Sequence, residues 1–160
     1  MNIFDFALKM EKDGEGFYRE IAAKTKNKGL QVILTMLADE EVKHYKAIES
    51  MKLDNYEMAE TSILNKAKNI FVEMKEQEQE FETDKEQIVL YEKAQEIEKK
   101  SQDFYNEKAQ QADSQEQKNL FVELAKEEEK HYFLLENIIK FVSKPKQWLE
   151  DAEWNHLEEY

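Results

Sequence analysis

The sequence has no cysteine, and only three glycines and one proline among 160 residues. Without cysteine the chain has no disulfides, thiolate metal sites or iron–sulfur and rubredoxin-type centres, so any bound metal needs oxygen and nitrogen ligands. The scarcity of glycine and proline removes the residues that most often interrupt helices. With its abundant Glu, Lys, Gln, Ala and Leu, the composition indicates one all-α domain that is long enough to bury a sizeable core.

Long apolar runs are also missing. No stretch approaches the roughly 20 residues of a membrane span, and charged residues interrupt the N-terminus. The formal charge of −13 disfavours nucleic acids and membrane surfaces as partners, because both are anionic. It suits cations better, although acidic surfaces mostly serve solubility. We therefore expect a cytoplasmic protein that binds neither nucleic acid nor membranes.

The second half of the chain repeats the first, without gaps, at an offset of 87 residues. The segment 37–45 reads LADEEVKHY, and its counterpart 124–132 reads LAKEEEKHY. Each half predicts a helical hairpin, because its apolar residues recur at helical spacing and turn residues separate the periodic stretches. The predicted helices span residues 3–26 and 30–53 in the first half, and 86–112 and 115–142 in the second.

Turn residues mark the predicted helix ends. Gly29 in the first connection favours a left-handed C-cap, Asp113 or Ser114 can cap the last helix, and Pro145 ends that helix. Between the hairpins, apolar residues at helical spacing predict a short crossover helix: Ile63, Ala67, Ile70, Phe71 and Met74. A linker of this length can travel along the whole bundle, so the third bundle helix would begin at the far end.

These elements predict a four-helix bundle over residues 1–144 and a tail over residues 145–160. In the tail, Trp148, Leu149, Ala152 and His156 share one stripe of a short helix. This stripe would pack either over one end of the bundle or against a second subunit. We expect the second subunit to be another copy of the chain, in a homodimer.

Six ionisable side chains fall on the apolar faces that would form the bundle core. Burying four carboxylates without partners is costly, and the four would repel one another. Two divalent cations would neutralise the four charges, while neutral imidazoles add nitrogen ligands. The sequence therefore predicts a pair of metal ions held by Glu11 of the first predicted helix, Glu41 and His44 of the second, Glu98 of the third, and Glu128 and His131 of the fourth.

The specificity of this signal comes from the repeat, because glutamate makes up 28 of the 160 residues and Glu-x-x-His can arise by chance. Both core motifs follow their upstream glutamate by 30 residues and match in register. Glu153 and His156 have the same spacing but no counterpart in the first half, so we regard this pair as accidental. The alternative for the core residues is an ordinary role as paired core or surface groups.

The repeated glutamate followed by Glu-x-x-His resembles the rubrerythrin branch of the ferritin-like superfamily over residues 3–142. The resemblance implies a ferritin-like bundle in which the six residues ligate two iron ions, with manganese and zinc as alternatives. It further implies that reduced iron reacts with hydrogen peroxide or oxygen, as in a response to oxidative stress. Glu41 and Glu128 would bridge the metals, while Glu11 and Glu98 would complete opposite ends.

Two features depart from the rubrerythrin pattern. Ser101 stands where rubrerythrins carry an additional ligand glutamate, three residues after the third-helix glutamate. The chain also lacks a rubredoxin-like cysteine module, so electrons would come from a separate donor protein. Besides a peroxide- or oxygen-reducing oxidoreductase, we therefore keep two alternatives: an iron-oxidising or iron-handling protein, and a metal-stabilised bundle without turnover.

Three further pairs of residues lie next to the predicted ligands. The two tyrosines could donate protons or hydrogen-bond a ligand carboxylate, or could be ordinary core residues. The two glutamates could accept the distal imidazole N–H groups, or could lie on solvated faces. The small residues could leave room for substrate, or could serve close helix packing. These pairs are Tyr18 and Tyr105, Glu40 and Glu127, and Gly14 and Ser101.

Overall fold

The computed structural model describes residues 2–52, 62–76, 85–145 and 148, and these residues form helices without any strand. This confirms the all-α fold. No helix within the described ranges combines the length and apolar character needed to cross a membrane. The helices are α1 (Ile3–Lys24), α2 (Lys28–Lys52), α3 (Ile63–Glu76), α4 (Lys85–Gln111) and α5 (Gln115–Ser143).

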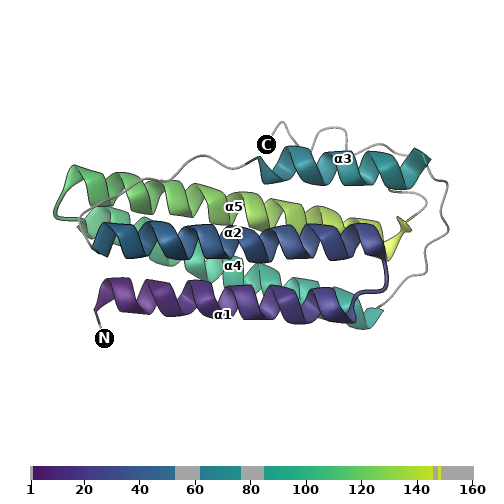
Figure 1. Cartoon of the computed structure of the whole chain (residues 1–160), viewed down its shortest axis with the longest axis horizontal. Helices are drawn as coiled ribbons and strands as arrows, with labels where there is room; N and C mark the ends of the chain where they lie inside the picture. Colours follow the sequence, from purple (N-terminus) through teal and green to yellow (C-terminus); the bar gives the residue numbers. More distant parts are fainter. Residues whose placement is uncertain (1, 53–61, 77–84, 146–147, 149–160) are drawn as a thin grey trace.

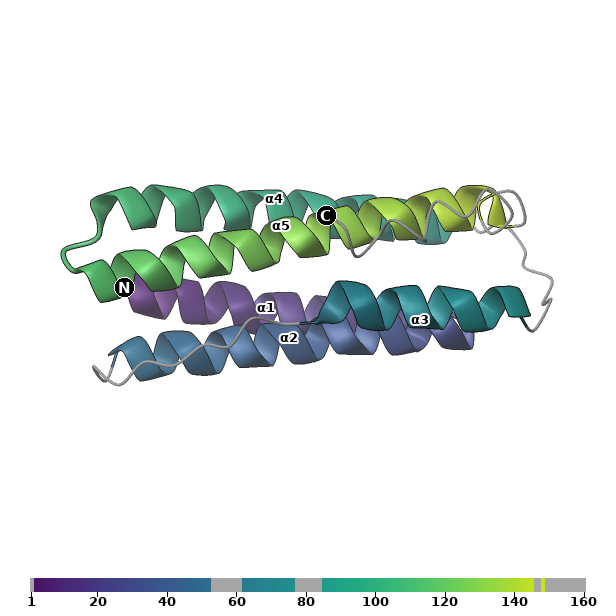
Figure 2. The ribbon, with the colours of Figure 1, turned by 90° about the horizontal axis from the view of Figure 1, so that it is seen from above.

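Two helical hairpins, α1–α2 and α4–α5, lie side by side along the long axis of the molecule (Figure 1). The helix α2 finishes at the end of the bundle where α1 begins, whereas α4 begins at the opposite end (Figure 1). The chain between them must therefore travel along the bundle, and α3 lies on this route, packed against α2 and α5 (Figure 2). This is the crossover connection of a ferritin-like bundle.

Side-chain caps fix where three of the helices begin. Asn2, Asn27 and Ser114 each accept the backbone N–H of the residue three positions further on, at 2.9, 3.0 and 3.1 Å respectively. Each bond satisfies an N–H group that has no partner inside its helix. Of the two candidates for the cap of the last helix, the structure selects Ser114.

The prediction that Gly29 forms a left-handed C-cap is wrong. The helix α1 ends at Lys24, its C-cap Thr25 has an extended backbone, and Gly29 lies in the first turn of α2. The glycine instead lets α3 approach α2. A Cβ atom at this position would overlap Cε of Met74 and lie 3.1 Å from Cγ2 of Ile70.

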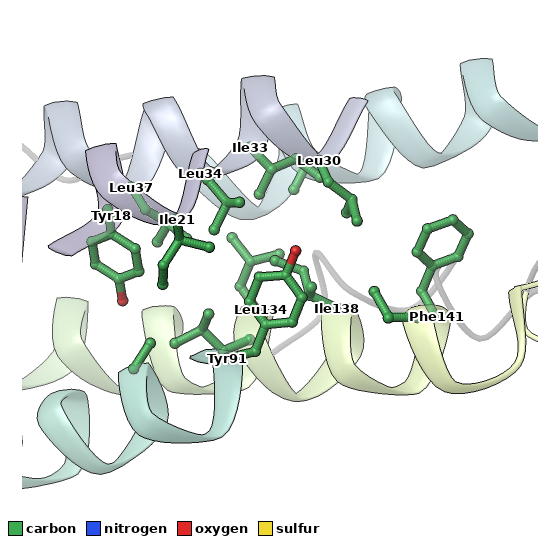
Figure 3. Packing of buried hydrophobic residues seen from close by; sticks show 14 of the residues in the cluster. Tyr18, Ile21, Leu30, Ile33, Leu34, Leu37, Tyr91, Leu134, Ile138 and Phe141 are labelled. Carbon is green, nitrogen blue, oxygen red and sulfur yellow. The ribbon is translucent and has the colours of Figure 1, made fainter. Parts of the chain in front are cut away.

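The core consists of two apolar clusters, one toward each end of the bundle. The first includes Ile21, Leu34, Tyr91 and Phe141, which point into the space between the two hairpins (Figure 3). The second contains residues from the other ends of the same four helices, among them Phe121. Only the first cluster extends onto α3. The buried glutamates and histidines predicted to bind metal belong to neither cluster.

Trp148, in the predicted tail, is buried against this first cluster at 4% exposure. Its ring centre lies 4.6 Å from that of Phe71 on α3 and 5.9 Å from that of Phe141 on α5. Trp148 thus joins the crossover helix to the last bundle helix. The other residues of the predicted tail stripe, Leu149, Ala152 and His156, lie outside the described residues.

Replacing Gly29 with alanine should destabilise the fold by about 1 kcal/mol, the low end of the cost of overpacking, because the added methyl group would overlap Met74 at the far end of its flexible side chain and press on Ile70. Met74→Ala should reduce this penalty by opening space. Urea unfolding of the two single variants and the double variant measures the coupling. Gly16→Ala is the control, since nothing lies within 4 Å of its Cβ position. An equal effect of Gly29→Ala in both backgrounds would contradict the packing role.

Candidate metal centre

The six side chains predicted to bind metal come together between the two apolar clusters. Each is at most 4% exposed. Glu41 and His44 project from the same face of α2, one turn apart, because residues at positions i and i+3 are neighbours on a helix. The helices α1 and α4 add one glutamate each, and α5 repeats the arrangement of α2.

Their ligand-type atoms form two overlapping groups, and within each group these atoms lie no more than 4.8 Å apart. We call the combined set the inner cluster. Both groups contain Glu41 and Glu128, which therefore lie between two positions that could each hold a cation. The first group is Glu11, Glu41, His44 and Glu128, and the second is Glu41, Glu98, Glu128 and His131.

The two imidazoles turn the same ring nitrogen toward the carboxylates. Nδ1 of His44 lies 2.9 Å from Oε1 of Glu128 and 3.4 Å from Oε2 of Glu11. Nδ1 of His131 lies 3.4 Å from an oxygen of Glu41 and 3.4 Å from one of Glu98. The rings are nearly parallel, with centres 5.4 Å apart. Each imidazole therefore bridges the two hairpins.

Several of these atoms are buried without a hydrogen bond of acceptable geometry in the described part of the chain. They are Nδ1 of both histidines, Oε2 of Glu11 and Glu98, and Oε1 of Glu128. Even the 2.9 Å approach of His44 to Glu128 does not satisfy Nδ1. Buried polar atoms are nearly always paired in folded proteins. Five unpaired atoms of ligand type, all turned into one space, fit a cation-binding centre.

The pKa values of the four carboxyl groups diverge. Burial and the charges of Glu11 and Glu98 raise the pKa of Glu41 and Glu128 well above the usual value. For Glu98, burial is outweighed by a hydrogen bond from Glu128 and by the nearby His131, which lower the pKa to about 2. The pKa of Glu11 is lowered too, as His44 and Glu41 outweigh burial. The two central carboxyl groups therefore favour the protonated form more than the two terminal ones do.

The two tyrosines predicted near the ligands are fully inside the protein and bond across the hairpins. The hydroxyl of Tyr18 on α1 donates to Oε1 of Glu98 on α4. In return, the hydroxyl of Tyr105 on α4 donates to Oε1 of Glu11 on α1 at 2.5 Å. Burial and the nearby carboxylates raise the pKa of both phenols well above its usual value, so both remain donors.

Glu40 and Glu127 lie on buried faces rather than solvated ones, with exposures of 5% and 0%. They form a third group of ligand-type atoms with the two histidines, again within 4.8 Å of one another. Because Nδ1 of each ring faces the inner cluster, Nε2 is the nitrogen left for these carboxylates. Each glutamate also pairs with a lysine one turn later, Lys43 at 3.3 Å and Lys130 at 3.2 Å respectively.

Gly14 and Ser101, the two small residues, are buried one turn after Glu11 and Glu98. A Cβ atom at Gly14 would lie 3.2 Å from Oε2 of Glu41. The glycine therefore gives the Glu41 carboxylate its room against α1. Ser101 holds the equivalent position of the repeat on α4.

The two lysine partners, Lys43 and Lys130, were missed by the sequence analysis. The available signal was the repeat, in which a lysine precedes the histidine in both halves. Glu153 and His156, regarded as an accidental motif, lie outside the described residues.

Comparison with known proteins gives one family. The family model described as rubrerythrin matches residues 2–139. No curated protein and no solved structure matches the chain. The matched range includes all four bundle helices up to the last turn of α5, and with them every residue of the inner cluster.

Without metal, the protein should lose stability as the pH rises above about 5. A group whose pKa is raised on folding stabilises the folded state. The full contribution is present at pH values below the pKa of the unfolded state, and it is lost as the pH rises through the pKa of the folded state. Glu41, Glu128 and His44 all act in this direction. The lowered pKa values of Glu11 and Glu98 act only in more acidic solution.

Urea unfolding in the presence of a chelator, between pH 5 and 8, measures this dependence. Each group contributes a limiting slope of about 1.4 kcal/mol per pH unit. Glu41→Gln/Glu128→Gln should flatten most of the profile, whereas Glu49→Gln/Glu116→Gln, the same charge change at exposed positions of α2 and α5, should not. A wild-type stability that rises with pH across this range would refute the assignment.

Proposed function

The chain belongs to the rubrerythrin family, and on that premise we propose that its inner cluster holds two iron ions and reduces hydrogen peroxide or oxygen. Electrons come from a separate donor protein, since the chain has no cysteine and hence no iron–sulfur or rubredoxin-type centre of its own. The acting form is a homodimer.

The observation that carries this proposal is the set of buried, unpaired ligand atoms in the inner cluster. Four carboxylates bring four negative charges into a dry core, and two divalent cations balance them. One glutamate from each of two helices, with Glu-x-x-His from each of the other two, is the ligand set of ferritin-like di-metal proteins. Oxygen and nitrogen ligands suit iron, manganese and zinc. Among these, iron fits redox chemistry.

We assign the ligand roles from the overlap of the two groups. Glu41 and Glu128 are common to both, so they would contribute to holding both cations. Glu11 and His44 would help to hold one cation, while Glu98 and His131 would help to hold the other. When bound, a reduced iron pair supplies two electrons and polarises the O–O bond of the substrate.

The tyrosines hold protons at the ends of the centre. Each hydroxyl donates to a terminal ligand carboxylate, Tyr18 to Glu98 and Tyr105 to Glu11. These bonds fix the orientation of the two carboxylates. They also hold a proton close to where hydrogen peroxide or oxygen would be reduced. Glu40 and Glu127 orient the histidines from their distal side.

Gly14 and Ser101 line the substrate space in this proposal. Both are small and buried, and both stand one turn beyond a terminal glutamate. Rubrerythrins carry an additional ligand glutamate at the position of Ser101. Without that carboxylate, the position of Ser101 would leave more room for a small oxygen species beside the centre.

Metal loading should raise the thermal midpoint of unfolding, because the cations bind the folded state preferentially. At a hundredfold excess of free metal over its dissociation constant, the expected rise is about 5–10 °C. Glu128→Gln should lose two-metal binding and most of this rise while the helices remain. Differential scanning calorimetry with elemental analysis tests both points. A metal-free protein that melts together with the loaded protein would count against the centre.

The reduced, iron-loaded protein should consume peroxide rapidly when an electron donor is added, and Glu41→Gln/Glu128→Gln should not. Stopped-flow measurement of peroxide against bound iron gives the stoichiometry, with Glu49→Gln/Glu116→Gln as the charge-matched control. Oxidation of many irons per chain would instead identify an iron-handling protein. Bound metal that reacts with neither peroxide nor oxygen would leave a metal-stabilised bundle.

A further inference from the structure

We propose a second cation site in this chain, an outer site formed by Glu40, Glu127 and the Nε2 atoms of His44 and His131, which receives divalent cations on their way to the inner cluster. The existence of the outer site stands on its own geometry. Its role in delivery rests on the proposed function of the inner cluster.

The outer site is composed of residues from α2 and α5 alone. The four residues offer ligand-type atoms that all lie within 4.8 Å of one another. On each helix the glutamate precedes its histidine by four residues, so both side chains share a face. The two helices cross here with their histidine rings stacked.

Unpaired polar atoms point to a ligand at this place. Oε2 of Glu40 and Nε2 of both histidines are buried and lack a hydrogen-bond partner in the described part of the chain. Both histidines are 0% exposed and Glu40 is 5% exposed. Since the Nδ1 atoms face the inner cluster, these Nε2 atoms belong to a separate space on the other edge of each ring.

The donor set matches a divalent metal. Two imidazole nitrogens and two carboxylate oxygens make the four-coordinate arrangement that zinc commonly adopts, and iron and manganese accept the same atoms. Lys43 and Lys130 lie beside the site, where they contact Oε1 of Glu40 and Glu127. They act as counterions when no metal is bound. The Lys43 side chain is 58% exposed and can swing into solvent when a cation arrives.

The inner and outer clusters compete for the same histidines. A neutral imidazole has a single lone pair, so a ring that ligates an inner cation through Nδ1 carries a proton on Nε2. That ring can no longer bind an outer cation. Its N–H then donates to the outer carboxylates, which orient the ring. The outer site is therefore a transit site that empties as the inner pair fills.

Zinc binding to three variants tests the proposal. The inner variant, Glu11→Gln/Glu41→Gln/Glu98→Gln/Glu128→Gln, should bind one zinc ion per chain, measured by equilibrium dialysis and elemental analysis. Adding Glu40→Gln/Glu127→Gln to it should abolish that binding. Circular dichroism verifies that each variant keeps its helices.

The outer variant, Glu40→Gln/Glu127→Gln alone, should still bind two zinc ions, but stopped-flow uptake should be at least about tenfold slower, as removal of steering charges produces. Glu49→Gln/Glu116→Gln serves as the charge-matched control. An inner variant that binds no zinc, or an outer variant that loads as fast as the control, overturns the proposal.

The same binding data distinguish a failure of the outer site from a failure of the inner metal pair. If the wild-type chain binds two zinc ions and the outer variant loads normally, the outer site fails while the inner pair stands. If the wild-type chain binds a single zinc ion, and the outer variant loses it, the outer site stands while the inner pair fails.

Discussion

Mutual repulsion among four buried carboxyl groups is the constraint on which the rest of this structure depends. At low dielectric, such charges interact far more strongly than in water. Burial and this repulsion raise the pKa of Glu41 and Glu128, while the hydroxyls of Tyr18 and Tyr105 donate to the other two carboxylates. Five ligand atoms still have no hydrogen-bond partner among the residues that the structure describes. The apolar clusters on either side hold the four bundle helices in place around this arrangement.

Internal repetition explains how one short motif builds a whole centre. One half of the chain supplies a single glutamate and a single Glu-x-x-His. Because α1 and α4 run in opposite directions, the bond from Tyr18 to Glu98 is repeated as the bond from Tyr105 to Glu11. Each contact in the centre thus appears twice. Among the described residues, α3 and Trp148 break this symmetry, since they pack on the first apolar cluster and not on the second.

The bundle and its inner cluster could be predicted because both depend on local periodicity, and the repeat displays that periodicity twice. The role of Gly29 could not, because it depends on the contact with Met74 across the crossover. The sequence left open whether Glu40 and Glu127 lie on a solvated helix face or beside the histidines. Which of two adjacent glutamates faces inward, and whether both are buried, depends on how α2 and α5 meet, and single-helix periodicity does not contain that information.

Adjacent glutamates before each histidine give the ring two acidic neighbours on different sides. In α2, Glu41 precedes His44 by three residues and Glu40 by four, and α5 repeats this spacing. The first position of each pair faces the outer space and the second faces the inner cluster. Each ring lies between two groups of carboxylates. A neutral ring has one lone pair, so it can bind a cation at only one of its two edges at a time. The order of the motif therefore couples the two spaces, because a cation bound at one edge of the ring makes the other edge a hydrogen-bond donor.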